Sequence, residues 1–320
     1  MSLTGLPSEI LSLILQTAVA DAAIPSDILR VCQLFHDVGT ECLYTHLKFT
    51  ASKQLQLFAM TRAPETPLIV PRSVTVDLTG KQDFYVFRYL RDTFVKCKWL
   101  ADEALARREG GDGDARMKRI SLRMHSYARD TEVEFLAEGL CAVSPDAFEW
   151  TGPDPDHHFS TAVIYHWVRS GTRKIIPPVA SCLFKHITSW SNIREVKVTN
   201  ISFATRSVHE GPFPPLIADL PSLRTLYMGQ ATFLHPQAIA GMFCQGRMSS
   251  MWQVRLVDAY SESIWGPRLR RSDVEKAAET LCHTDDQNAV IARIKRVVTC
   301  EKKTERIMGG DRVEGTHILY

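Results

Sequence analysis

Short β-rich runs alternate with helical segments over most of the chain, and this alternation limits the possible folds more than any other feature. The runs begin near residues 47, 74, 119, 148, 195, 223 and 252. Four of the six intervals are about 27 to 29 residues, and two are about half as long again. Strands that alternate with helices pair in parallel through right-handed crossovers. We therefore expect an α/β protein in which residues 50–320 form one irregular strand–helix repeat.

Helical segments are expected between the runs. They lie at residues 52–62, 83–108, 131–143, 160–171, 179–190, 235–244 and 271–281, and further apolar segments follow at 290–300 and 312–320. Two stretches interrupt the pattern. Residues 107–116 are Gly-rich and charged, which is typical of a surface loop, and the Pro-rich residues 210–215 indicate a stiff connector.

The clearest repeat unit is Leu220–Met228, with the sequence LPSLRTLYM and apolar residues at Leu223, Leu226 and Met228. This unit resembles a degenerate leucine-rich repeat, and Asn200 would take that family's Asn-ladder position in its own unit. The resemblance implies a leucine-rich-repeat-like solenoid whose concave strand face binds a partner protein. An ordinary α/β domain is the alternative.

Residues 3–49 precede the repeat and read as a small helical unit. Pro7 and Glu9 mark a helix start, because Pro is tolerated in the first turn and an acidic side chain complements the helix dipole there. A break at 22–27 offers Ser26 or Asp27 as the cap of a second helix. That helix is predicted to end at Gly39. The first helix carries apolar residues at helical spacing, namely Ile10, Leu11, Ile14, Leu15, Ala18 and Val19.

So small a unit cannot bury all of its apolar side chains internally. The surplus includes Leu6, Ile10, Leu11, Leu15 and Val31. This surplus predicts an exposed apolar docking face. The alternative is that the same side chains pack on the rest of this chain.

The segments LPSEIL, DILRVCQLFHDVG and CLYTHLKF resemble an F-box, over residues 5–49. The family favours Trp at two positions where this chain has Phe35 and Leu43-Tyr44, so the resemblance is to the F-box-like variants of fungal families. It implies a domain over residues 1–49 that binds the Skp-type adaptor of a cullin-based ubiquitin ligase. The adaptor contacts that it implies are Leu6, Pro7, Glu9, Ile10, Ile14, Leu15, Leu29, Val31, Cys32 and Phe35.

Residues 11–23 also resemble the apolar core of a secretory signal peptide. However, no Lys or Arg precedes them, and Pro7 and Glu9 stand where basic residues are expected. The formal net charge is +2, without the clustered basic face of a nucleic-acid-binding protein. The chain contains no apolar run of membrane-spanning length. We therefore expect no nucleic acid and no membrane as partners, and a cytoplasmic or nuclear location.

The eight cysteines are widely scattered, and no Cys-x-x-Cys pair occurs, which argues against a structural zinc site. Free, buried thiols are the simplest expectation. The best metal candidate is the segment Asp154–His158, but adjacent His side chains in an extended chain point apart, and a solvated loop is favoured. Cys282-His283 does not form a facing pair on a helix. No common catalytic or phosphate-binding motif occurs, so no catalytic residue, metal or cofactor is assigned.

The alternation of the strands predicts which side chains face outward and contact a target protein. They are Arg123, His125, Lys197, Thr199, Arg224, Tyr227, Gln253 and Arg255. Several are basic, which allows an acidic partner. The leading hypothesis is a non-catalytic substrate receptor of a ubiquitin ligase that docks through residues 1–49 and binds a target with residues 50–320. The alternatives are an interaction scaffold whose first helices only cap the solenoid, and an enzyme with an unfamiliar site near Asp154.

Overall fold

The structure is a computed structural model of the 320-residue chain. It describes residues 3–22, 24–61, 69–78, 85–107, 116–124, 133–152, 165–167, 173–175, 179–203, 213–244, 249–282, 287–304 and 318–320.

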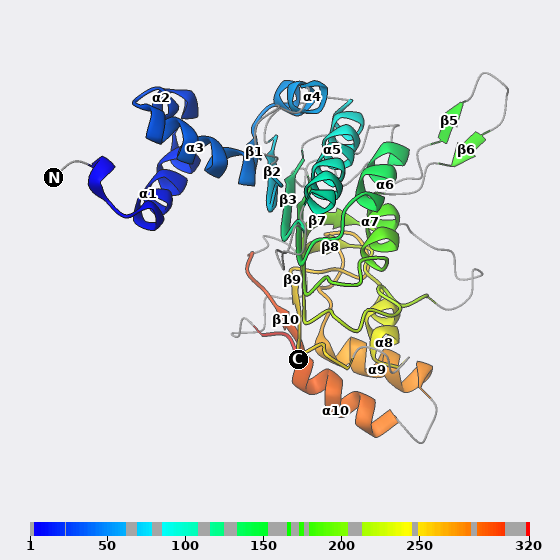
Figure 1. The fold of residues 1–320 in the computed structure, drawn as a ribbon. Helices are drawn as coiled ribbons and strands as arrows, with labels where there is room; N and C mark the ends of the chain where they lie inside the picture. Colours follow the sequence, from blue (N-terminus) through cyan, green and yellow to red (C-terminus); the bar gives the residue numbers. More distant parts are fainter. Residues whose placement is uncertain are drawn as a thin grey trace.

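One eight-stranded sheet organises the molecule, as Figure 1 shows. Its strands are His46–Phe49 (β1), Ser73–Asp77 (β2), Arg119–Arg123 (β3), Ala147–Thr151 (β4), Glu195–Ser202 (β7), Thr225–Thr232 (β8), Gln253–Val257 (β9) and Val298–Glu301 (β10). Each strand pairs in parallel with the next one along this series. The seven predicted runs begin within two residues of the observed strands, and the expected α/β class is confirmed.

The pairing register stacks side chains into two continuous buried rows. The first row is Leu47, Val74, Ile120, Phe148, Val196, Leu226, Val254 and Val298, and the second is Phe49, Val76, Leu122, Trp150, Val198, Met228, Leu256 and Cys300. Because side chains alternate along a strand, the residues between these rows point to the other face of the sheet. One face therefore carries the core, and the opposite face carries polar residues.

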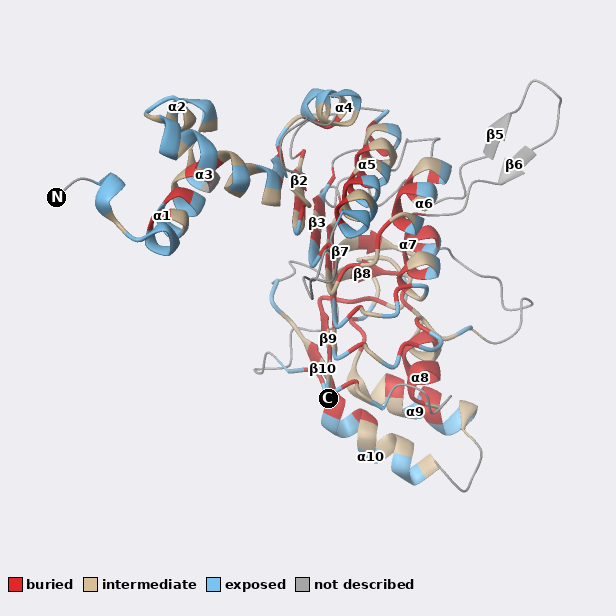
Figure 2. Cartoon of the chain, viewed as in Figure 1, coloured by how far each residue is buried: buried red, intermediate tan, exposed pale blue. Residues whose placement is uncertain are grey.

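Helices cover the buried face (Figure 1). They are Ser52–Met60 (α4), Val86–Ala106 (α5), Val133–Cys141 (α6), Val179–Ile187 (α7), Pro236–Cys244 (α8), Arg271–Leu281 (α9) and Gln287–Val297 (α10). Their apolar sides join the two strand rows in a single core cluster. Figure 2 shows the same division, with buried residues concentrated between the strands and the helices.

The first helices are Ser8–Asp21 (α1), Pro25–Leu29 (α2) and Gln33–Thr45 (α3), after a short 3₁₀ turn. The prediction of one second helix that ends at Gly39 is wrong. Two helices, α2 and α3, take its place, and α3 continues past Gly39. A Cβ at Gly39 would lie 2.5 Å from Leu29 Cδ2. Gly39 therefore serves as a contact point at which α2 packs against α3, and not as a helix end.

A second correction concerns residues 160–171, which the alternation predicted as helix. Tyr165–Trp167 (β5) is a strand, and it pairs antiparallel with Arg173–Ile175 (β6). Aromatic side chains favour strands, and the pairing partner lies outside the helical window. The Gly-rich loop at 108–115 and the connector at 210–212 fall outside the described residues.

The C-terminal residues close the sheet edge beside β10. The N–H of Leu319 donates to the carbonyl of Cys300 at 2.9 Å, and the Leu319 side chain is buried. The Arg271 guanidinium lies 4.9 Å from the Tyr320 ring, and Ser272 donates to the Tyr320 carbonyl. Covering an edge strand in this way satisfies hydrogen-bonding groups that would otherwise recruit a foreign strand.

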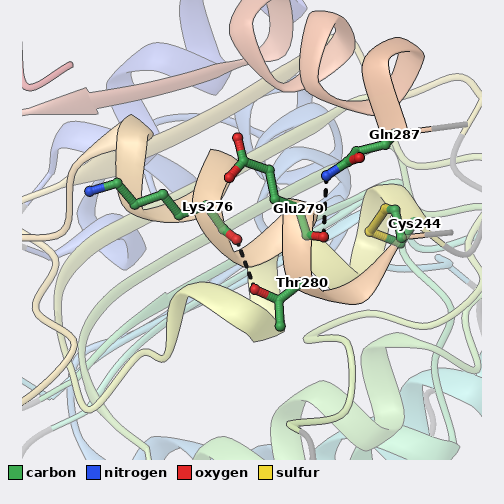
Figure 3. The surroundings of a disulfide bond; sticks show 6 residues. Cys244, Lys276, Glu279, Thr280 and Gln287 are labelled. Carbon is green, nitrogen blue, oxygen red and sulfur yellow. Dashed lines mark hydrogen bonds between the residues drawn. A yellow bond between two sulfur atoms is a disulfide. The ribbon is translucent and has the colours of Figure 1, made fainter. Parts of the chain in front are cut away.

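Cys244 and Cys282 form a disulfide, so the expectation that all cysteines are free thiols is wrong for this pair. Their Cα atoms are 5.6 Å apart, although 38 positions separate them in the sequence. The two residues stand at the ends of α8 and α9, which pack side by side. Figure 3 shows the surroundings, where Gln287 donates to the Glu279 carbonyl and Thr280 donates to the Lys276 carbonyl.

We expect reduction of the Cys244–Cys282 disulfide to lower the free energy of unfolding by about 2–4 kcal/mol, because the bond restricts the unfolded chain. Urea unfolding with and without reductant measures this change. The control is the Cys244→Ser/Cys282→Ser variant, whose midpoint should not respond to reductant. An unchanged wild-type midpoint, with the bond shown to be open by thiol counting, would contradict the prediction.

Candidate functional site

The N-terminal helices carry many apolar side chains that remain in contact with solvent. On α1, Ile10, Leu13 and Ile14 share one side by their spacing and are 45%, 61% and 39% exposed. We define the N-terminal apolar surface as the exposed apolar residues of this segment, namely Leu3, Ile10, Leu13, Ile14, Ile24, Val31, Leu34 and Tyr44. Exposed apolar side chains gathered on one side of a helix, as Ile10, Leu13 and Ile14 are, are typical of an interaction surface.

The opposite side of α1 is buried. Leu11, Leu15 and Val19 repeat every four residues and lie inside the helical segment, where α1 packs against α3. The expectation that Leu11 and Leu15 belong to the exposed surplus is therefore wrong. Cys42 on α3 approaches the Ser12 carbonyl of α1 at 3.8 Å, and burial, together with the charge of Glu41, raises the pKa of this thiol.

The ten residues predicted as adaptor contacts divide into three groups. Leu15 is buried, Leu6, Leu29, Cys32 and Phe35 are half-buried, and Pro7, Glu9, Ile10, Ile14 and Val31 are exposed. Sequence reasoning missed Leu13 and Leu34, which are more exposed than Ile14. Helical spacing shows that α1 carries apolar residues on two sides. It does not show which side is buried, because that depends on how α3 packs against α1.

The N-terminal helices touch the sheet mainly where α3 runs into β1, as Figure 1 shows. Leu11, Leu15 and Val19 belong to a separate buried group, and the core cluster of the sheet begins at Leu47. The cap hypothesis requires Leu6, Ile10 and Leu15 to be buried against residues 50–80. Ile10 is instead exposed, and Leu15 is buried among the helices.

The second surface is the open strand face, the face of the sheet opposite α4–α10. We define its centre as the row Glu149, Lys197, Tyr227 and Arg255, which the register places side by side on β4, β7, β8 and β9. Lys197 Nζ lies 6.0 Å and the Arg255 guanidinium 5.7 Å from the centre of the Tyr227 ring. A tyrosine flanked by two cations is a common element of protein-binding surfaces.

Each cation of this row has an acidic partner within the chain. Lys197 forms an ion pair with Glu149, and Arg255 forms two hydrogen bonds with Glu301, at 2.8 and 2.9 Å. Arg119 also reaches Glu149, at 3.4 Å. The open strand face is therefore a mixed surface of paired charges around Tyr227.

The titration of these groups follows from the pairing. Partial burial alone would raise the pKa of Glu149, but its hydrogen bonds and charge interactions with Lys197 and Arg119 lower it overall. The hydrogen bond from Arg255 lowers the pKa of Glu301. Burial raises the pKa of Tyr227, so its hydroxyl stays protonated and can donate to a bound partner.

The predicted target-contact residues are only partly brought together. Lys197, Tyr227 and Arg255 form the central row, and Thr199, Gln253 and Arg123 lie on the same face in neighbouring rows. Arg224 precedes β8 in an exposed turn, away from this row, and His125 lies outside the described residues. The acidic partners Glu149 and Glu301 were missed, because the parallel register that pairs them is set by residues far apart in the sequence.

Gly229 explains how the Tyr227 ring is placed. A Cβ at Gly229 would lie 2.9 Å from Tyr227 Cε1 and 3.2 Å from its hydroxyl oxygen. The ring therefore extends along the strand over Gly229. Directly beyond this point, Asn200, Gln230 and Asp258 on three adjacent strands all have positive φ values, of 54°, 49° and 49°. Asn200 and Gln230 lie within β7 and β8, which pair again at Ile201 and Ala231, and Asp258 directly follows β9.

The other sites considered from the sequence are candidate metal ligands and a cysteine–histidine pair. The segment Asp154–His158 and His283 lie outside the described residues. Within the described ranges, no group of three His, Cys, Asp or Glu side chains is arranged to hold a metal ion. No helix in that part of the chain has the length and apolar character needed to cross a bilayer.

Compared with protein-family models, curated proteins and solved structures, the chain gives no match.

Proposed function

We propose that this chain is a non-catalytic substrate receptor of a cullin-based ubiquitin ligase. In this proposal residues 1–49 form an F-box-like domain that binds a Skp-type adaptor, and residues 50–320 form a leucine-rich-repeat-like solenoid that holds a target protein. The receptor acts by proximity, since tethering raises the effective concentration of the target near a ubiquitin-loaded enzyme. No residue of the chain takes part in the chemistry.

The observation that carries the proposal is the N-terminal apolar surface. The three helices bury Leu11, Leu15 and Val19 among themselves and still leave Ile10, Leu13 and Val31 exposed, the last at 66%. A segment that only capped the sheet would turn its apolar side chains toward β1 and α4. The exposed side chains instead favour a second protein that covers them.

The parallel repeat of residues 46–301 supports the target-binding half of the proposal. Eight strands follow one another in chain order, and the described helices lie on one face, so the other face offers a continuous surface. At its centre Tyr227 is half-buried, which limits the entropy lost when a partner orders it, and an ion pair flanks it on each side. These residues make this face the proposed target site.

A scaffold whose first helices cap a solenoid is the second candidate. The continuous contact from α3 into β1 favours it, because a cap must join the sheet at that edge. It predicts that removal of exposed apolar side chains from α1 leaves every interaction of the chain unchanged.

The test is co-purification of the full chain with a Skp-type adaptor. We expect the Ile10→Ser/Ile14→Ser/Val31→Ser variant to bind the adaptor about 100-fold more weakly than the wild type, because the three exposed side chains lose their apolar contact. All three are exposed, so the variant should keep the stability of the wild type.

The matched control is Leu57→Ser/Trp99→Ser/Leu105→Ser. These residues are equally exposed, at 55%, 46% and 54%, but they lie on α4 and α5. The control should bind the adaptor like the wild type. Equal binding by the wild type and the N-terminal variant would contradict the docking site, and weaker binding by the control would place the adaptor on the outer helices instead.

A further inference from the structure

A cysteine and a histidine from two neighbouring helices meet on the helix-covered side of the molecule. Cys141 is the last residue of α6, and His186 lies in the last turn of α7. The Cys141 Sγ and His186 Nδ1 atoms are 3.3 Å apart. Cys141 is exposed, whereas the other free cysteines of the chain are buried or half-buried.

The surrounding packing holds this pair in place. Trp190 is 2% exposed, and its Nε1–H donates to the carbonyl of Leu140, the residue before Cys141, at 3.1 Å. The Ser189 hydroxyl donates to the His186 carbonyl at 2.6 Å. The buried Trp190 hydrogen bond thus ties the turn after α7 to the end of α6, and the Ser189 hydrogen bond closes the last turn of α7 at His186.

The chemistry of the two side chains is complementary. Burial, together with the charge of Lys185, lowers the pKa of His186, which favours the neutral ring. An unprotonated Nδ1 is a proton acceptor, and the thiol is the donor within its reach. A nucleophile and a base at this separation, with the nucleophile open to solvent, is the arrangement that activates cysteines.

We propose that Cys141 and His186 form a reactive thiol–imidazole pair, a covalent modification site for soft carbon electrophiles of the α,β-unsaturated carbonyl class. Sγ attacks the β-carbon, a C–S bond forms, and the C=C π bond breaks. His186 takes the thiol proton and returns it to the α-carbon. The overall step adds S–H across the double bond, so it needs no oxidant and releases no leaving group.

The test uses N-ethylmaleimide, which belongs to this class, on the native full-length chain without reductant. Labelling is stopped at short times, and the modified cysteines are identified by peptide mass mapping. We expect Cys141 to react first, and His186→Gln to slow its labelling at least about tenfold, since general-base assistance is commonly larger than that. His36→Gln is the control and should change the rate less than about twofold, because this exposed histidine lies on α3 and is not the base beside Cys141.

Cys182 reports on the fold during the same experiment. It lies one turn before His186 and is 7% exposed, and burial raises its pKa to about 11. It should stay unlabelled in the wild type and in both variants. Labelling of Cys182 in His186→Gln would show that this variant is misfolded. The pair is then tested in the wild type, where the imidazole NMR signals of His186 should shift when Cys141 is labelled.

Three results would overturn the proposal. The first is a wild-type Cys141 that reacts no faster than the half-buried Cys32 and Cys42. The second is equal labelling of Cys141 in the wild type and in a folded His186→Gln variant. The third is a His186 signal that does not respond to the adduct on Cys141.

Discussion

Replacing Arg268 with Ala should lower the free energy of unfolding by about 3–5 kcal/mol, because it leaves a carboxylate buried without its ion-pair partner. The Arg268 and Asp258 side chains are 1% and 2% exposed, and Nε donates to Oδ1 at 2.8 Å. The same carboxylate accepts the backbone N–H groups of Lys303 and Thr304. The pair therefore joins β9 to the chain that follows β10.

The control for this prediction is Lys303→Ala. Lys303 belongs to the same cluster, but its backbone makes the contact with Asp258, and the residue itself is exposed. Its replacement should change stability by less than about 0.5 kcal/mol. The double variant Arg268→Met/Asp258→Asn should regain part of the loss, since both charges are removed together. A cost below about 1 kcal/mol for Arg268→Ala, in urea unfolding, would contradict this account of the C-terminal region.

Trp190→Ala is the second change with a large expected effect, a loss of about 3–5 kcal/mol, because the truncation leaves a cavity in the core. The Trp190 ring lies edge-on to Phe148, with centroids 5.2 Å apart, and its N–H satisfies the buried Leu140 carbonyl. It connects the turn after α7 with β4 and α6. Thermal unfolding followed by circular dichroism measures the loss.

Two further substitutions separate the contributions of Trp190. Trp190→Phe keeps an aromatic ring but removes one of the two donors to the Leu140 carbonyl, which also accepts the Val143 N–H at 3.4 Å, so it should cost about 0.5–1.5 kcal/mol. Trp252 is 64% exposed, and Trp252→Ala should change stability by no more than about 0.5 kcal/mol. Similar losses of stability for Trp190→Ala and Trp252→Ala would contradict the prediction, because the burial of Trp190 would then contribute nothing to stability.

The strands could be predicted from the sequence because their signal is local. Runs such as Val74–Val76 and Val196–Val198 alternate apolar and polar residues, and most of the predicted runs are followed by a helical pattern. The parallel order then follows from the connections between them. The apolar content of α1 is equally clear in the sequence, and five of the ten predicted adaptor contacts are exposed.

The errors come from interactions between residues distant in the sequence. Gly39 has the sequence position of a helix end, but Leu29 approaches it within the fold, and α3 continues. The Cys244–Cys282 bond depends on how α8 and α9 pack, and the Glu149–Lys197 ion pair depends on the sheet register. None of these contacts has a signature in the spacing of the residues that form it.

The most direct test of the proposed function is titration calorimetry of the purified full chain with a Skp-type adaptor. We expect a one-to-one complex with a negative heat-capacity change, because binding would cover the N-terminal apolar surface, including Ile10, Leu13 and Val31. The heat should be lost in the Ile10→Ser/Ile14→Ser/Val31→Ser variant. A folded wild-type chain that gives no complex with the adaptor would contradict the receptor proposal and favour the capped scaffold.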